Sequence, residues 1–214
     1  MFVHYDAAKV EAQYLHPKIA AKKVNIRSAV ILPAKVEITK ESAKGSEMMV
    51  SESADISKSV MAAVDQALQE KKIGVVANSF EPAAMDDIRK YQLADIQTRY
   101  DALLPKLVKK SKDVKKARFT LGDEVMLLNV HKDADVIVFI RGQGRVFTKG
   151  KTAFSILSFS LDFPLATITV GIVDARSGEV LAFTKPMTAS SVLKDKKSLS
   201  KMIQKSLKKL PTAA

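Results

Sequence analysis

The stretch from Asp135 to Thr184 constrains the fold most, because it contains three segments with the composition of β-strands. Residues 136–140 are five consecutive apolar residues, which would expose a large apolar patch unless they form a buried strand. Residues 166–173 alternate between apolar and small or polar types, and a period of two is typical of a half-buried strand. Gly178 then supplies the positive φ that a short hairpin loop needs. The sequence therefore predicts three strands of one sheet, the last two joined as a hairpin.

Strands and helices alternate before this stretch. Residues 28–32 form a short apolar strand, and residues 34–49 are interpreted as a polar connection. A helix follows, because apolar residues recur every four positions from Ile56 to Leu68 behind serines and Asp55 that suit its first turn. Gly74 should end this helix, and residues 75–76 begin a second strand.

A long helix is predicted next, with its inner face marked by Met85, Ile88, Ile96, Tyr100 and Leu103. Pro105 should end or kink it, because proline lacks the N–H that an interior helical position donates. A shorter helix is expected over residues 120–129.

The last element is an amphipathic helix near the carboxy terminus, with an apolar stripe at Leu199, Met202, Ile203, Leu207 and Leu210 and lysines opposite. Strand and helix order together predict an α/β (α+β) fold. It should have a mixed sheet of about five strands, with helices packed against the sheet and a late β-hairpin. We expect an amino-terminal extension over residues 1–24, one domain over residues 25–210 and a short tail over residues 211–214.

Positive charge is concentrated in the second half of the chain. Residues 101–214 carry 21 basic and 10 acidic side chains, against 14 and 13 in residues 1–100. Such asymmetry indicates an anionic partner. The side chains proposed to contact it are Lys109, Lys110, Lys112, Lys115, Lys116, Arg118, Lys201, Lys205 and Lys208. These clusters also fit ordinary solvated faces, and lysines without interleaved aromatic residues do not predict specific nucleic-acid recognition.

Disulfides, thiolate metal sites and thiol nucleophiles are excluded, because the chain has no cysteine. The segment after Met1 does not match a secretory signal. Residues 153–173 are long enough to span a membrane, but Asp162 and Pro164 interrupt them, so a spanning helix is not expected.

A family resemblance is carried by two segments. Residues 133–139 (Asp-Ala-Asp-Val-Ile-Val-Phe) enter the first of the three late strands, and residues 173–180 (Val-Asp-Ala-Arg-Ser-Gly-Glu-Val) close the hairpin. With the order of elements, they resemble bacterial envelope domains similar to the amino-terminal domain of the translocation protein TolB, the curli-secretion lipoprotein and the penicillin-binding-protein activator lipoproteins. The resemblance covers about residues 25–210.

This resemblance implies a domain of the periplasm or the outer membrane that binds other envelope proteins and often forms oligomers. Relatives of this type are usually anchored by a lipidated cysteine. The sequence departs from that pattern, since it shows neither a signal peptide nor a lipobox cysteine. Either both lie outside this chain or this relative is not lipidated, and the alternative location is the cytoplasm. The resemblance implies no catalytic residues.

Two other motifs resemble known kinds of site. Residues 142–152 end in Gly150-Lys151-Thr152 like a phosphate-binding loop, but Arg145 stands where that loop requires glycine. We therefore expect a strand continuation or a bulge followed by a lysine-bearing loop, and no nucleotide site. His131, Asp133 and Asp135 are spaced as metal ligands, yet a stable site needs support that the sequence does not offer, and a polar turn is preferred. No catalytic residue, metal or cofactor is therefore expected.

Three functions follow in order of preference. The first is a non-enzymatic cell-envelope domain that binds protein partners, as an oligomer or within a secretion or cell-wall assembly. The second is a basic module for an anionic polymer or an anionic membrane surface. The third, an NTP-binding enzyme, rests only on Gly150-Lys151-Thr152.

Overall fold

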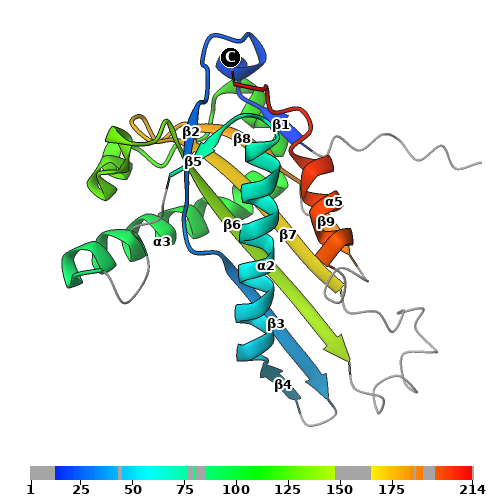
Figure 1. Cartoon of the computed structure of the whole chain (residues 1–214). Coiled ribbons are helices and arrows are strands. Elements are labelled where there is room, and N and C mark those ends of the chain that lie inside the picture. The colour runs from blue at the N-terminus through cyan, green and yellow to red at the C-terminus, as the bar shows by residue number, and fades with distance from the viewer. Residues whose placement is uncertain are drawn as a thin grey trace, which may run out of the picture.

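One mixed sheet with helices on both faces forms the molecule (Figure 1). The computed structural model describes residues 13–42, 45–76, 80, 85–147, 165–185, 187–189 and 196–213. The predicted α+β class is confirmed. The expectation of about five strands is wrong, because the described residues form nine: β1 (Gln13–Leu15), β2 (Ser28–Ile31), β3 (Lys35–Ser42), β4 (Gly45–Met48), β5 (Gly74–Val75), β6 (Val136–Phe147), β7 (Leu165–Asp174), β8 (Val180–Thr184) and β9 (Met187–Ala189).

Strand β6 organises the sheet. Its first residues pair with β2 in parallel, its later residues pair with β3 in parallel, and its other edge pairs with β7 in antiparallel register from Val136↔Asp174 to Arg145↔Leu165. Strand β5 extends the sheet beyond β2, whereas β8 and β1 extend it beyond β7. The predicted strands over residues 136–140 and 166–173 therefore belong to one sheet, as expected. Ile137 is fully buried.

The late hairpin forms as predicted between β7 and β8. The Asp174 carboxylate accepts hydrogen bonds from the backbone N–H groups of Arg176 (2.9 Å) and Ser177 (2.8 Å). Gly178 closes the turn with a φ of +69°, and a Cβ at this position would lie 2.0 Å from the Gly122 carbonyl oxygen. Aspartate and glycine here build a turn, and their role is structural.

The interpretation of residues 34–49 as a connection is wrong, because residues 35–42 and 45–48 form the antiparallel strands β3 and β4. Val36 and Ile38 are buried while Lys35 and Glu37 are exposed, which is the alternation of a half-buried strand. The flanking lysines and glutamates mask this short pattern in the sequence.

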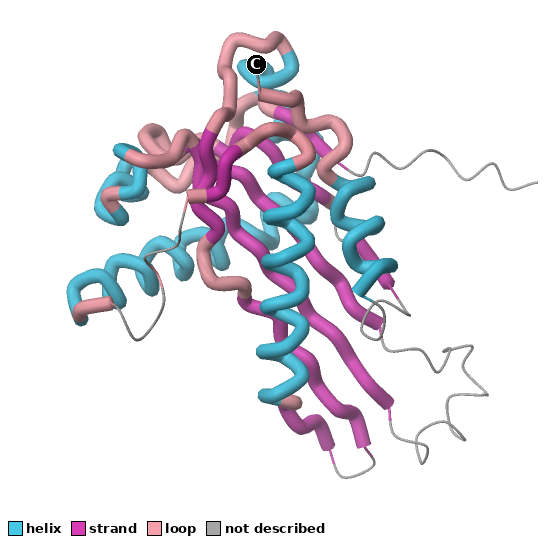
Figure 2. The backbone as a smooth tube through the Cα atoms, in the orientation of Figure 1, coloured by secondary structure: helices cyan, strands magenta, loops and turns pink. Residues whose placement is uncertain are grey.

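Helices α2 (Val50–Gln69) and α5 (Lys196–Ser206) lie along one face of the sheet (Figure 2). The apolar core on this face includes Val60, Val64, Leu68, Leu199 and Ile203, which pack with alternate residues of β2, β6 and β7. The apolar stripe of α5 thus contributes to the core. The same stripe is therefore not available to a lipid surface while the helix stays docked.

Helix α3 (Asp87–Lys109) covers the opposite face, together with the 3₁₀ segments η2 (Ser111–Lys116), η3 (Asp123–Leu128) and η4 (Val130–Lys132). The Asp86 carboxylate caps α3 by accepting the N–H of Arg89 at 2.7 Å. Pro105 does not end the helix, which continues for four more residues. The expectation for Ile88 is wrong, because this side chain is 71% exposed and does not mark the inner face.

The predicted boundary at residue 25 lies inside the folded unit. Strand β1 pairs antiparallel with β8, and the short helix α1 (Pro17–Ala20) follows it. Tyr14 and Ile19 are both 1% exposed, so the region that we expected to be an extension contributes to the core from Gln13 onward.

Candidate functional site

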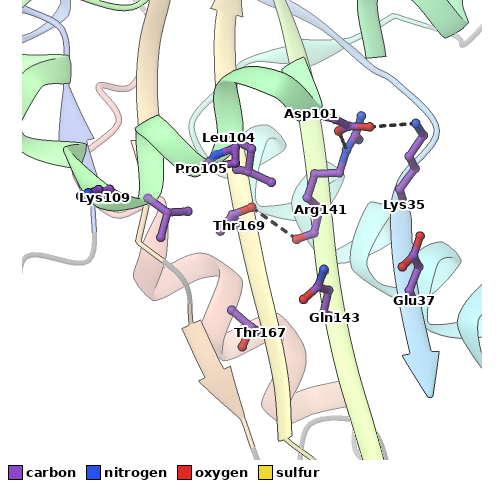
Figure 3. Close-up of a pocket in the computed structure, with 12 residues that line it drawn as sticks. Lys35, Glu37, Asp101, Leu104, Pro105, Lys109, Arg141, Gln143, Thr167 and Thr169 are labelled. Carbon is purple, nitrogen blue, oxygen red and sulfur yellow. Dashed lines mark hydrogen bonds and ion pairs between the residues drawn. The ribbon is translucent and has the colours of Figure 1, made fainter. Parts of the chain in front are cut away.

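A cleft of about 650 Å³ lies between the carboxy-terminal half of α3 and the part of the sheet formed by β3, β6 and β7 (Figure 3). Its volume is within the usual range for sites that bind small ligands or short chain segments. Leu104, Pro105 and Val108 of α3 form an apolar wall, with Lys109 beside them.

Two cross-strand rows of side chains form the floor of the cleft. Lys35, Arg141 and Thr169 are register partners in the first row, and Glu37, Gln143 and Thr167 are register partners in the second. Because side chains two residues apart on a strand share a face, both rows point to the same side of the sheet. The neighbouring residues Val36, Ile38, Ile140 and Ile168 point to the other side and are buried. The fold therefore sets a polar floor against an apolar wall.

Asp101 joins the wall to the floor. Its carboxylate accepts a hydrogen bond from Nε of Arg141, and its second oxygen lies 3.0 Å from Nζ of Lys35. One carboxylate is thus shared by two cations that come from adjacent strands. Figure 3 shows both side chains directed toward Asp101.

The Arg141 side chain is 7% exposed. Its Nη1 donates to the carbonyl oxygen of Ile140 at 2.9 Å, and its Nη2 has no hydrogen-bond partner among the described residues. The guanidinium carbon of Arg141 also lies 5.4 Å from the ring centroid of Tyr100 and 6.0 Å from that of Phe139, within cation–π range. This cation is therefore held by rings as well as by Asp101.

The ring of Tyr100 packs against the Arg141 guanidinium. Its ring stacks on Phe139 with centroids 4.2 Å apart, and the side chain is fully buried. Burial raises the pKa of the Tyr100 hydroxyl well above its ordinary value, and the nearby Arg141 only partly opposes this. Tyr100 is accordingly a neutral packing residue, and the charges available at the cleft are those of its floor and rim.

The cleft has the features of a binding site. Its wall offers apolar contact, and its floor offers hydrogen-bond donors and acceptors. The lining includes three cations and two carboxylates. Among the described residues, no three histidine, aspartate or glutamate side chains are grouped closely enough to hold a metal ion.

The side chains predicted to contact an anion are all exposed: Lys109, Lys110, Lys112, Lys115, Lys116, Arg118, Lys201, Lys205 and Lys208. Lys109 lies at the cleft. Lys116 and Arg118 both lie near Asp113, at 3.5 Å and 3.7 Å. Lys201, Lys205 and Lys208 are on α5 and the turn after it, on the other face of the sheet.

The two basic clusters, residues 109–118 and residues 201–209, approach each other at the edge strand β1. Nζ of Lys115 lies 5.6 Å from the ring centroid of Tyr14, and Nζ of Lys185 lies 5.8 Å from the same ring. The side-chain oxygen of Gln13, the neighbouring residue, accepts the backbone N–H of Lys209 at 3.0 Å. Clusters that are about 90 residues apart in sequence therefore border one strand.

The two rejected motifs keep structural roles in the described residues. Residues 142–147 continue strand β6, as predicted, so their backbone groups pair with β3 and β7. Gly150, Lys151 and Thr152 lie outside the described residues. Asp135 accepts hydrogen bonds from the N–H groups of Arg27 (2.8 Å) and Ser28 (3.1 Å), which ties β2 to the start of β6.

Sequence reasoning missed Lys35, Asp101 and Arg141 as site residues. The available signal was the alternation Arg141-Gly-Gln143-Gly-Arg145 directly after an apolar run, which places polar side chains on one face of a continuing strand. The meeting of β3 with this segment depends on long-range pairing that no local pattern indicates.

No protein-family model matches the sequence, and no curated protein matches it. Among solved structures, a PelC dodecamer from Paraburkholderia phytofirmans is 13% identical, with a TM-score of 0.41, over 94% of this chain and 96% of that one. A PelC variant dodecamer from the same organism is 15% identical, with a TM-score of 0.38, over 89% and 90% of the two chains. Likeness at this level carries no argument about fold or function.

None of the helices in the described residues is long and apolar enough to cross a membrane.

Proposed function

We propose that this protein is a non-catalytic binding domain of the bacterial cell envelope, which binds protein partners and assembles with copies of itself. The observation that carries the proposal is the cleft between α3 and the β3–β6–β7 floor. It combines an apolar wall with polar groups that the fold holds in fixed rows.

The geometry favours binding of a chain segment. Gln143 and Glu37 are exposed on the floor, whereas Arg141 and Thr169 are buried and positioned by neighbouring groups. Rigid polar groups beside apolar surface are typical of sites that fix the orientation of a bound molecule.

The envelope assignment rests on the resemblance described above. The segments that carry it lie side by side, since residues 136–139 are the start of β6 and residues 173–180 include the end of β7 and its hairpin turn. A periplasmic or outer-membrane-associated location follows from this resemblance, and it is part of the proposal.

Site-specific photo-cross-linking tests the partner. A benzophenone amino acid at Val108, which is 41% exposed beside the cleft, should cross-link to one defined protein in living cells of the natural host. The same group at Lys58, exposed on α2 across the sheet, should not yield that product. Equal products at both positions, or none at Val108, would contradict a partner at the cleft.

Two simpler measurements test location and assembly. Fractionation of the same cells should place the protein with envelope markers, and recovery in the cytosol would contradict the envelope assignment. Light scattering of the purified protein should give a multiple of 23.4 kDa, whereas a monomer at all concentrations would remove self-assembly from the proposal.

A second candidate function is favoured by the charges around β1. Lys115 and Lys185 direct two ammonium groups at one tyrosine ring from separate elements, and the second basic cluster borders the same strand. An anionic polymer crossing this edge would contact both clusters, so the protein would be a basic binding module.

A further inference from the structure

The cations in the cleft are incompletely neutralised by their own surroundings. Lys35 and Arg141 share the single carboxylate of Asp101, and Lys35 keeps 44% of its side chain exposed at the rim. A guanidinium has five N–H donors, and a buried donor without an acceptor costs free energy. Nη2 of Arg141 is such a donor among the described residues.

The polar floor continues beyond this pair. Gln143 and Thr167 follow Arg141 and Thr169 in the next row, and Glu37 adds a carboxylate two residues from Lys35. A bound alkyl chain would desolvate these groups without offering them hydrogen bonds, which is unfavourable. A peptide backbone carries a donor and an acceptor at nearly every residue and can satisfy them.

The apolar wall of the cleft can bind an apolar side chain of the ligand. Leu104, Pro105 and Val108 face the floor from α3, and Val108 is 41% exposed. Covering such surface with an apolar side chain removes it from water and stabilises the complex by about 25 cal/mol for each Å² buried.

We propose that the cleft binds a peptide segment that ends in, or carries, a carboxylate next to an apolar side chain. The carboxylate lies beside Lys35 and Arg141, the apolar side chain packs against Leu104, Pro105 and Val108, and the backbone crosses Gln143 and Thr167. This inference rests on the proposed function and specifies the chemistry of the partner segment. Carboxylates suit this place because arginine and lysine form charge-assisted hydrogen bonds with them.

The test uses two probe peptides and the folded full chain. Acetyl-Leu-Val-Phe with a free carboxy terminus is titrated into ¹⁵N-labelled protein, and the same peptide with an amidated terminus serves as the uncharged match. The free acid should shift the amide signals of residues 141–143 and 167–169 and bind about tenfold more tightly than the amide, as expected for one charge-assisted hydrogen bond.

Variants locate the charge. Lys35→Gln should reduce the affinity for the free acid by about tenfold, to that of the amide, and leave the affinity for the amide unchanged. Lys40→Gln is the matched control, because Lys40 is exposed on the same strand but faces the other side of the sheet. Val108→Asp should weaken both peptides. These three positions are exposed, so the variants should fold.

Several outcomes would overturn the inference. Equal affinity of the cleft for the acid and the amide would show that the peptide carboxylate is not recognised, but the cleft could still bind protein segments. If neither peptide shifts the amide signals of the cleft residues while Val108 still cross-links to a protein partner, the proposed ligand class is wrong and the proposed function is unaffected. Tighter binding of dodecanoate than of either peptide would assign the cleft to a lipid.

Discussion

At the scale of single residues, the contact between Tyr100 and Gly171 leaves no room for a side chain at position 171. A Cβ on residue 171 would lie 2.2 Å from the Tyr100 hydroxyl oxygen and 2.8 Å from the ring carbon that bears it. The ring is also stacked on Phe139, so it cannot withdraw. Glycine is therefore required in the middle of β7 for close approach of a helix side chain.

Gly171→Ala should lower the free energy of unfolding by about 3 kcal/mol, the cost of overpacking a core that cannot relax. Urea denaturation followed by circular dichroism measures this. Gly74→Ala is the control, since the nearest atom to its Cβ would be the Arg27 carbonyl oxygen at 3.6 Å. It should change stability by less than about 1 kcal/mol, and an equal loss in both variants would refute the tight contact.

His16 carries a pH dependence. It is 2% exposed, and its Nδ1 accepts the backbone N–H of Lys18 at 3.1 Å, which caps α1. Burial lowers the pKa of His16 below its ordinary value of 6.5, because the charged ring would lose water and could no longer accept this bond; the charge of Glu179 opposes the shift only in part.

The unfolded chain thus binds a proton at His16 near pH 6.5, whereas the folded protein resists it to a lower pH. The stability that this residue contributes is complete above pH 6.5 and is lost as the pH falls below it. His16→Asn retains a capping oxygen without the titration. The difference in unfolding free energy between the two proteins should therefore change between pH 7 and pH 5, and a constant difference would refute the assignment.

At the scale of elements, α5 shows what a periodic pattern of apolar residues predicts and what it leaves open. The stripe predicted from the sequence is largely the buried face, since Leu199, Ile203 and Leu207 are 3% exposed or less. The lysines on the opposite side are exposed. The pattern predicts an apolar face but does not say what covers it, and here the covering elements are α2 and the sheet.

Ile203→Ala should destabilise the protein by about 2–5 kcal/mol, because a buried side chain is truncated in a packed core. Lys201→Ala on the same helix should stay within about 0.5 kcal/mol of the parent protein. Thermal and urea unfolding of both variants measure the contrast. Similar small effects would mean that α5 is not docked in solution, and the lipid-surface interpretation would regain support.

Other elements escaped prediction for identifiable physical reasons. The late strands were predicted because apolar runs and alternation are local properties. Strand β3 was missed because its partner on β6 is about 100 residues away, and α3 passes Pro105 because tertiary packing around Leu107 outweighs one lost helical hydrogen bond. Ion pairs such as Asp101 with Arg141 depend on that pairing and have no sequence signal of their own.

At the scale of the whole molecule, the basic residues of the second half of the sequence are distributed over both faces of the sheet. The basic half of the sequence does not form one face: Lys201 and Lys205 are on the α5 side, and Lys112 and Lys116 are on the α3 side, while β1 lies between them. A polyanion must therefore bend around this edge to use both clusters.

Binding of a polyphosphate should weaken steeply as salt is raised, since each neutralised phosphate releases a counterion. Replacing both Lys115 and Lys185 with glutamine should reduce the slope of log affinity against log salt by about 1–2, and Lys58→Gln should leave it unchanged. Fluorescence anisotropy at several salt concentrations measures the slope. No binding at low ionic strength would retire the polyanion function.

Strand β6 offers one edge to two strands in succession, and this arrangement gives the intervening residues a special role. Leu32 still donates to the Val138 carbonyl oxygen at 3.0 Å, Gln97 of α3 donates to the Pro33 carbonyl oxygen at 3.3 Å, and β3 begins at Lys35. Because side chains alternate with a period of two, the number of residues between β2 and β3 determines which side chains of β3 face the cleft. One residue inserted there would turn Val36 and Ile38 into the cleft and Lys35 and Glu37 under α2, so the polarity of the site is encoded by a count of residues outside it.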